Sequence, residues 1–136
     1  MGLAQKRIVK EYQDTPFAQW KKEFDKIVGF NMPIEVKWET LMNDDYDKKD
    51  QYFAWFDMVY FRPLKMVFQE LCEDKMGKEA VKESVKQIII DGSTGHTPEH
   101  SKFEAGTFFL IHKFHSNVDQ EDERVKTWAK MIGDKL

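Results

Sequence analysis

The chain has 136 residues, of which 33% are charged and 41% hydrophobic, and its formal net charge is −3. These proportions are ordinary for a globular protein and exclude a disordered or collagen-like chain. Lysine and arginine are scattered among acidic residues and form no basic face, so we expect no nucleic-acid partner.

No apolar run approaches the roughly 18–20 residues needed to cross a bilayer, and the N-terminus lacks the apolar segment of a signal peptide. The single cysteine, Cys72, cannot form an internal disulfide and suits a reducing compartment. We therefore predict a soluble, cytoplasmic protein without a membrane partner, folded as one domain over residues 1–136.

Residues 1–13 fit a short helix or an extended arm equally well, and the first clear signal is Thr15-Pro16. Thr15 can cap a helix, and Pro16 suits its first turn because an N–H there would have no helical partner. The predicted helix carries an apolar stripe as far as Val28 and ends at Gly29.

Pro33–Glu39 alternates between apolar and charged side chains, which predicts a strand with one buried face. In this register Trp38 points inward and Lys37 points outward. The next element, Tyr52–Cys72, is the most apolar segment and predicts a central helix that is covered on more than one side. Pro63 is expected to kink or split that helix because it removes a backbone donor.

A short helix is expected over Lys78–Val85, followed by a β-branched strand at Ile88–Ile90. A long loop, Gly92–Ala105, leads to a third strand at Thr107–Phe114, and a short hairpin could end at Ala105-Gly106. The consecutive apolar residues Phe108–Ile111 are typical of a strand that is covered on both faces or placed centrally.

The last predicted element is a helix capped by Asn117 or Asp119, with an apolar stripe through Val125, Trp128, Ile132 and Leu136. The resulting order is α-β-α-α-β-β-α. We therefore predict an α+β fold in which a small three-stranded, mostly antiparallel sheet packs against a long central helix, with flanking N- and C-terminal helices.

The histidines are the main candidates for chemistry. His96 and His100 lie in the long loop, and imidazole pairs at such spacing do bind metals. His112 and His115 end the third strand, where side chains three residues apart point to opposite faces. We therefore predict no metal site and no cofactor.

Three other segments resemble functional motifs but lack the residues or the setting that those motifs need. The acidic segment Asn43–Asp50 resembles a calcium loop, but Lys48 and Ala54 stand where that loop needs glycine and glutamate. Gly92–Gly95 lacks the spacing of a phosphate-binding loop, and Cys72 belongs to an apolar helix. No catalytic residue is predicted, and the sequence leaves open whether the protein is an enzyme.

Large rings are abundant around the central helix, and surplus apolar surface marks contact with a partner. The leading hypothesis is a non-catalytic protein–protein interaction module, with Met58 or Phe61 buried by another protein or by a second copy in a homodimer. The alternative is a small-ligand-binding or enzymatic domain in which residues 92–105 close over a pocket near His112 and Trp38. The candidate binding residues are Trp38, Trp55, Met58, Phe61, His96, His100 and His112.

Overall fold

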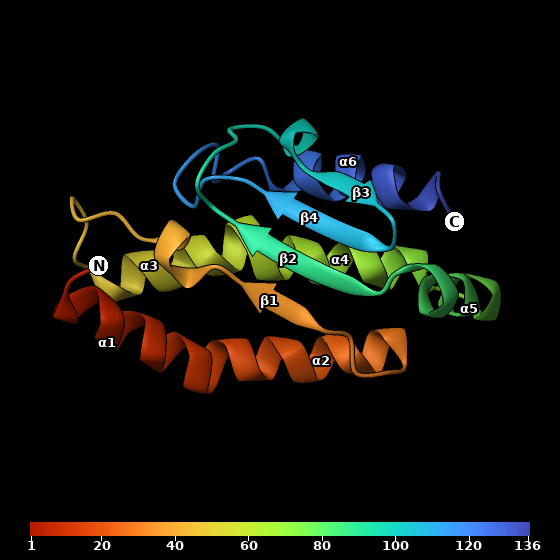
Figure 1. The fold of residues 1–136 in the computed structure, drawn as a ribbon, viewed down its shortest axis with the longest axis horizontal. Coiled ribbons are helices and arrows are strands. Elements are labelled where there is room, and N and C mark those ends of the chain that lie inside the picture. Colours follow the sequence, from red (N-terminus) through yellow and green to blue (C-terminus); the bar gives the residue numbers. More distant parts are fainter.

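The computed structural model describes residues 1–136 as a four-stranded sheet with helices packed against it (Figure 1). The helices are α1 (Leu3–Tyr12), α2 (Ala18–Val28), α3 (Lys49–Phe56), α4 (Arg62–Leu71), α5 (Lys75–Ser84) and α6 (Glu121–Gly133). The strands are β1 (Ile34–Val36), β2 (Gln87–Asp91), β3 (Lys102–Glu104) and β4 (Thr107–Ile111). None of the helices is both long enough and apolar enough to cross a membrane.

The strand order is β1-β2-β4-β3, with β1 and β2 parallel, β2 and β4 parallel, and β3 antiparallel to β4. The predicted α+β class is confirmed, but the three-stranded, mostly antiparallel sheet is wrong. From β1 to β2 the chain passes through α3, α4 and α5, which is long enough to return it to the same end of the sheet. The hairpin at Ala105-Gly106 is present and joins β3 to β4, with positive φ at both residues.

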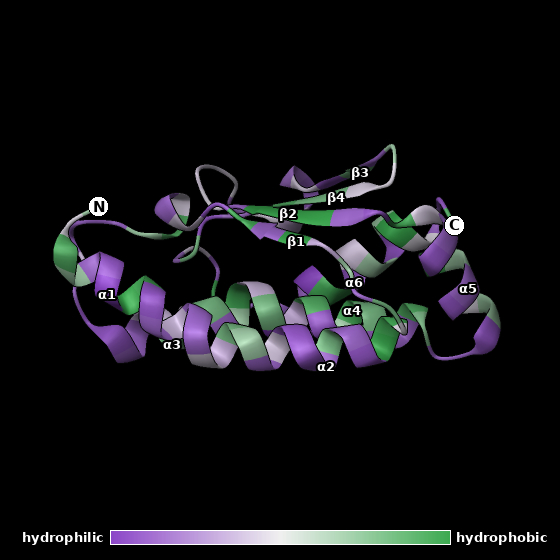
Figure 2. Cartoon of the chain, turned by 60° about the horizontal axis from the view of Figure 1, so that its bottom comes forward, coloured by the Kyte–Doolittle hydropathy of each residue, from purple (hydrophilic) through white to green (hydrophobic).

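The two faces of the sheet have different surroundings. Figure 2 shows the strands on one side of the molecule and the helices α1–α4 and α6 on the other. Ile88, Ile90, Phe108 and Leu110 point toward the helices and are fully buried. The opposite face carries no helix, so the central position predicted for Phe108–Ile111 holds while the cover on both faces does not.

Two helical runs pass through prolines by way of π-helical turns. α1 continues into α2 through Gln13–Phe17, so Pro16 lies inside a helical run and the predicted helix start at Thr15 is wrong. α3 continues into α4 through Asp57–Phe61, and Pro63 is the second residue of α4. The wider π-helical turn shifts the hydrogen-bond register around the missing proline donor.

The remaining bounds differ from prediction mainly at the ends of elements. β1 stops at Val36, and Trp38 begins a 3₁₀ turn, Trp38–Leu41, because Thr40 bonds both Lys37 O and the N–H of Gly92. The strand expected to reach Phe114 ends at Ile111. The last helix is preceded by Gln120, which makes no side-chain cap.

Candidate functional site

The predicted aromatic surface is an internal cluster. Phe61 is only 3% exposed, and its ring lies 5.6 Å from that of Tyr12 and 5.3 Å from that of Phe17. Trp38 packs against the same group, with its ring 5.5 Å from Phe17. The expectation that Phe61 faces a partner is therefore wrong, because α1 covers the side of the central helix that sequence reasoning left open. Met58 is half-buried and makes no part of the core.

Trp55 belongs to a second group of rings. Its ring lies 5.1 Å from that of Tyr46 and 5.5 Å from that of Phe114. Every aromatic side chain of the chain is buried or half-buried. The surplus of rings is thus used mainly for internal packing, and the exposed large apolar side chains are aliphatic or methionine.

A carboxylate that sequence reasoning missed ties the two helical runs together. Asp57 Oδ1 accepts hydrogen bonds from Tyr12 OH at 2.7 Å and from Trp20 Nε1 at 2.8 Å. Burial and the neighbouring Asp57 raise the pKa of Tyr12 far above its usual range, so this phenol stays protonated. Asp57 lines none of the surface hollows, and its role is to hold the helices together.

The predicted histidines do not converge. His96 Nδ1 bonds Ser116 Oγ at 2.6 Å and His100 Nδ1 bonds Thr97 Oγ1 at 3.2 Å, both at exposed positions. His112 is fully buried, and its Nδ1 lies 2.8 Å from Lys113 O. No three His, Cys, Asp or Glu side chains come together where they could hold a metal ion. No surface hollow is lined by His96, His100 or His112.

Arg124 is a buried cation that binds carbonyl oxygens. Its guanidinium donates to Asn117 O at 2.7 Å, to Val118 O at 2.7 Å and to Met58 O at 2.9 Å. The N–H of Arg62 donates to Asp57 O five residues back, so the next donor in that register would be the N–H that Pro63 lacks. Arg124 therefore supplies the donor that Met58 O is missing.

Helical periodicity could have identified Arg124 as buried. It lies four residues before Trp128 and eight before Ile132, which places the three side chains on one face of α6. A charge on such a face must be paired or hydrogen-bonded, as Arg124 is.

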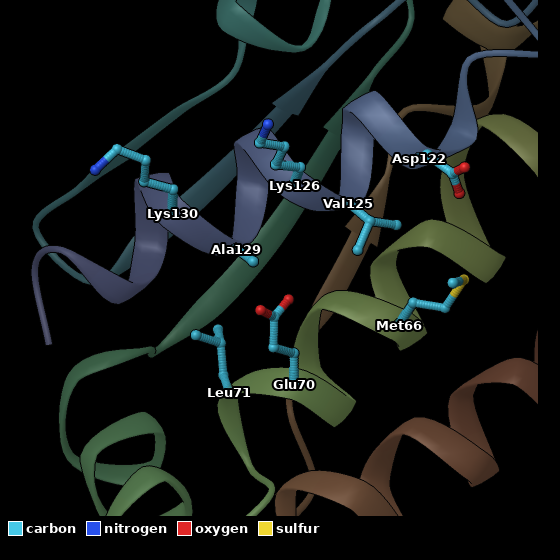
Figure 3. Close-up of a pocket in the computed structure, with 8 residues that line it drawn as sticks. All are labelled: Met66, Glu70, Leu71, Asp122, Val125, Lys126, Ala129 and Lys130. Atoms are coloured by element: carbon cyan, nitrogen blue, oxygen red, sulfur yellow. The ribbon is translucent and has the colours of Figure 1, made fainter.

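A groove between α4 and α6 is one of the two surface hollows with the most apolar side chains in their lining (Figure 3). The two helices run side by side in the same direction. At their first residues Arg62 Nη2 lies 2.6 Å from Glu121 Oε2, and at their last residues Gly133 lies next to the Leu71 side chain. The groove has a volume of about 450 Å³. Its lining residues are Met66, Glu70, Leu71, Asp122, Val125, Lys126, Ala129 and Lys130.

The groove has an apolar floor, and charged side chains line it as well; the Glu70 carboxylate projects from α4 toward α6 (Figure 3). Met66 is 38% exposed, and Leu71 and Val125 are half-buried. A second hollow of about 330 Å³ shares Glu70 and Leu71 with the groove and continues toward α5. Glu70 on α4 and Lys126 on α6 are exposed, and neither forms an ion pair within the chain.

A smaller, polar hollow of about 240 Å³ lies beyond the carboxyl ends of β2 and β4 and includes Ser93, Lys113 and His115. Open sheets with parallel strands often bind ligands at this edge. Its volume, however, is below the roughly 300–1,000 Å³ of ligand pockets. No protein-family model, curated protein or solved structure matches the chain.

Proposed function

We propose that the chain is a non-catalytic protein-interaction module that binds an amphipathic helix of a partner in the groove between α4 and α6. The observation that carries this proposal is the uncovered apolar floor formed by Met66, Leu71 and Val125. Soluble proteins rarely leave contiguous apolar surface exposed without a use for it. A helix with apolar residues at i, i+4 and i+7 is a common occupant of such a groove.

The charged side chains of the groove suggest the pattern of the partner helix. Glu70 projects from α4 toward α6, whereas Lys126 and Lys130 extend from α6 on the side away from α4 (Figure 3). Lys130 already pairs with Asp134 at 2.8 Å, whereas Glu70 and Lys126 are free to pair with a partner. A helix that carries lysine opposite Glu70 and glutamate opposite Lys126 complements both charges and presents its apolar stripe to the floor.

The alternative, a small-ligand-binding or enzymatic domain, has less support. It required a pocket lined by His96, His100 or His112, and these side chains lie apart. The loop after β2 instead borders the small polar hollow through Gly92 and Ser93. Two hydroxyls contact an imidazole, Ser116 Oγ with His96 Nδ1 at 2.6 Å and Thr97 Oγ1 with His100 Nδ1 at 3.2 Å. Neither pair lines a surface hollow in which a substrate could bind.

The proposal is tested with a synthetic helical peptide of about 14 residues that carries a leucine stripe flanked by lysine and glutamate. Calorimetry should show saturable binding to the full chain. Met66→Lys should weaken binding at least about tenfold, because it removes one apolar contact worth roughly 1.5 kcal/mol or more.

Leu3→Lys provides the matched control, since Leu3 is 62% exposed and lies on α1, which does not line the groove. It changes the same kind of exposed apolar side chain and should leave peptide affinity unchanged. Equal affinities for the wild type and Met66→Lys would reject the groove as the binding surface.

A further inference from the structure

The bare face of the sheet carries three apolar side chains on its two central strands, among charged and polar neighbours. Ile89, Phe109 and Ile111 alternate with the buried residues of β2 and β4 and therefore point away from the helices. All three are half-buried, yet none is packed against the hydrophobic core. All-parallel sheets are normally covered on both faces, and three of the four strands here run parallel. The three apolar side chains on the outer face therefore lack the cover that is usual for such strands.

Strand pairing aligns one row of outward side chains across the whole sheet. Glu35 of β1 lies opposite Ile89 of β2, Ile89 opposite Phe109 of β4, and Phe109 opposite Lys102 of β3. The row therefore reads acid, apolar, apolar, base from one edge to the other. Lys102 Nζ lies 5.1 Å from the centre of the Phe109 ring, on this same face.

The charges beside the row are matched within the chain. Lys37 Nζ lies 3.8 Å from Asp91 Oδ2, and Glu104 Oε2 lies 3.6 Å from Lys102 Nζ, the basic end of the row. Glu35 is exposed and forms no ion pair in the chain. A cover for this face therefore needs an apolar centre and a positive charge opposite Glu35.

We propose that a second copy of the chain covers this face, related by a two-fold axis parallel to the strands. This rotation exchanges the two edges of the sheet, so Glu35 faces the partner subunit's Lys102 and Ile89 faces the partner subunit's Phe109. A two-fold axis across the strands through the same row would instead set Glu35 against the partner subunit's Glu35. The charge pattern of the row favours the first arrangement.

The interface is small. Four strands spaced about 4.8 Å apart and five residues rising about 3.3 Å each give a face of roughly 300 Å². A standard interface buries about 800 Å² per partner, so this dimer is expected to be weak and concentration-dependent. Both α4–α6 grooves lie in the helix layers and stay uncovered, so the dimer neither requires nor blocks the proposed function.

Sedimentation equilibrium of the full chain from about 10 µM to 1 mM tests the dimer. The wild type should dimerise within this range, and Ile89→Lys should raise the dissociation constant at least about tenfold. Met66→Lys, in the groove, is the control and should dimerise like the wild type. A chain that stays monomeric to 1 mM, or associates equally well after Ile89→Lys, overturns the proposal and leaves the face to another occupant.

Charge exchange tests the axis. Glu35→Lys and Lys102→Glu should each weaken self-association, because each places like charges together. An equimolar mixture of the two variants should form a heterodimer, since each acidic row end then meets a basic one. Failure of the mixture to associate more tightly than either variant alone rules out this pairing. Unchanged binding of the helical peptide by Glu35→Lys separates this outcome from that of the proposed function.

Discussion

The two faces of the sheet take alternate residues of the same strands, and only the outer face mixes apolar with charged side chains. Ile88, Ile90, Phe108 and Leu110 on the inner face are fully buried against the helices. Ile89, Phe109 and Ile111 on the outer face remain half-buried and outside the core. Neighbouring residues of one type thus differ in their contribution to folding, because the period of two sends them to opposite environments. Residue type alone does not set the contribution of an apolar side chain.

The largest expected effect separates two adjacent phenylalanines. Phe108→Ala should lower the free energy of unfolding by about 3–5 kcal/mol, because it leaves a cavity beside Trp128, whose ring lies 6.0 Å away. Phe109→Ala should cost about 1 kcal/mol, mainly through lost contact with Lys102. Urea unfolding at low micromolar concentration measures both. Similar costs for the two variants would mean that the outer face is covered within the monomer.

The inner face also carries one titratable side chain, and it predicts a pH dependence. Burial lowers the pKa of His112 to about 4, compared with about 6.5 in the unfolded chain. Between these values the unfolded state binds a proton that the native state does not. Stability is therefore fully present above pH 6.5 and is lost as the pH falls toward 4, by roughly 3 kcal/mol in all.

Unfolding measured across this pH range in His112→Gln isolates the contribution. The variant should lose the part of the slope that is due to His112, whereas His96→Gln, at an exposed position, should keep the wild-type slope. Identical slopes in the wild type and His112→Gln would show that the buried imidazole is not the group that titrates.

A hydrogen bond fastens the helix layer to the inner side of β4. Tyr60 OH donates to His112 O at 2.5 Å, and both residues are fully buried. Tyr60→Phe leaves that carbonyl without its donor and should cost about 1–3 kcal/mol in urea unfolding. Tyr46→Phe is the matched control, because the hydroxyl of Tyr46 bonds no protein group, and it should cost less than about 0.5 kcal/mol.

Local pattern predicted most elements but not how they combine. Periodicity located the central helix, the C-terminal helix and all three strands that run parallel, with errors at their ends. Strand direction depends on where the chain returns after α5, which no local pattern encodes. The π-helical turns were not predicted either. Thr15-Pro16 has the chemistry of a helix start, and the helix continues through it in the fold, where the Phe17 ring packs against Phe61.

The candidate groove lay beyond sequence reasoning for a related reason. Met66 occurs in an apolar helix, and its exposure follows from the position of α6, which leaves a gap beside it. The sequence shows more large rings than one helix face needs, because it does not predict whether residues 1–13 are helical. In the fold this segment forms α1, and Tyr12 packs against Phe53 and Phe56. The strand period of two could have predicted the inward placement of His112, since it continues the alternation of Phe108 and Leu110.

The smallest expected effect lies at the edge of the outer face and divides stability from association. The Lys102 side chain is 50% exposed and its partner Glu104 is 60% exposed, so their ion pair is screened by water. Lys102→Ala should therefore change the free energy of unfolding by less than about 0.5 kcal/mol at low micromolar concentration. The same change removes the positive charge opposite the partner subunit's Glu35, so the dimer should weaken and its salt dependence should fall. Urea unfolding and sedimentation in about 0.05 and 0.5 M NaCl measure the two effects separately. A loss of stability above 1 kcal/mol with association unchanged would reverse the assignment and make Lys102 part of the fold of the monomer.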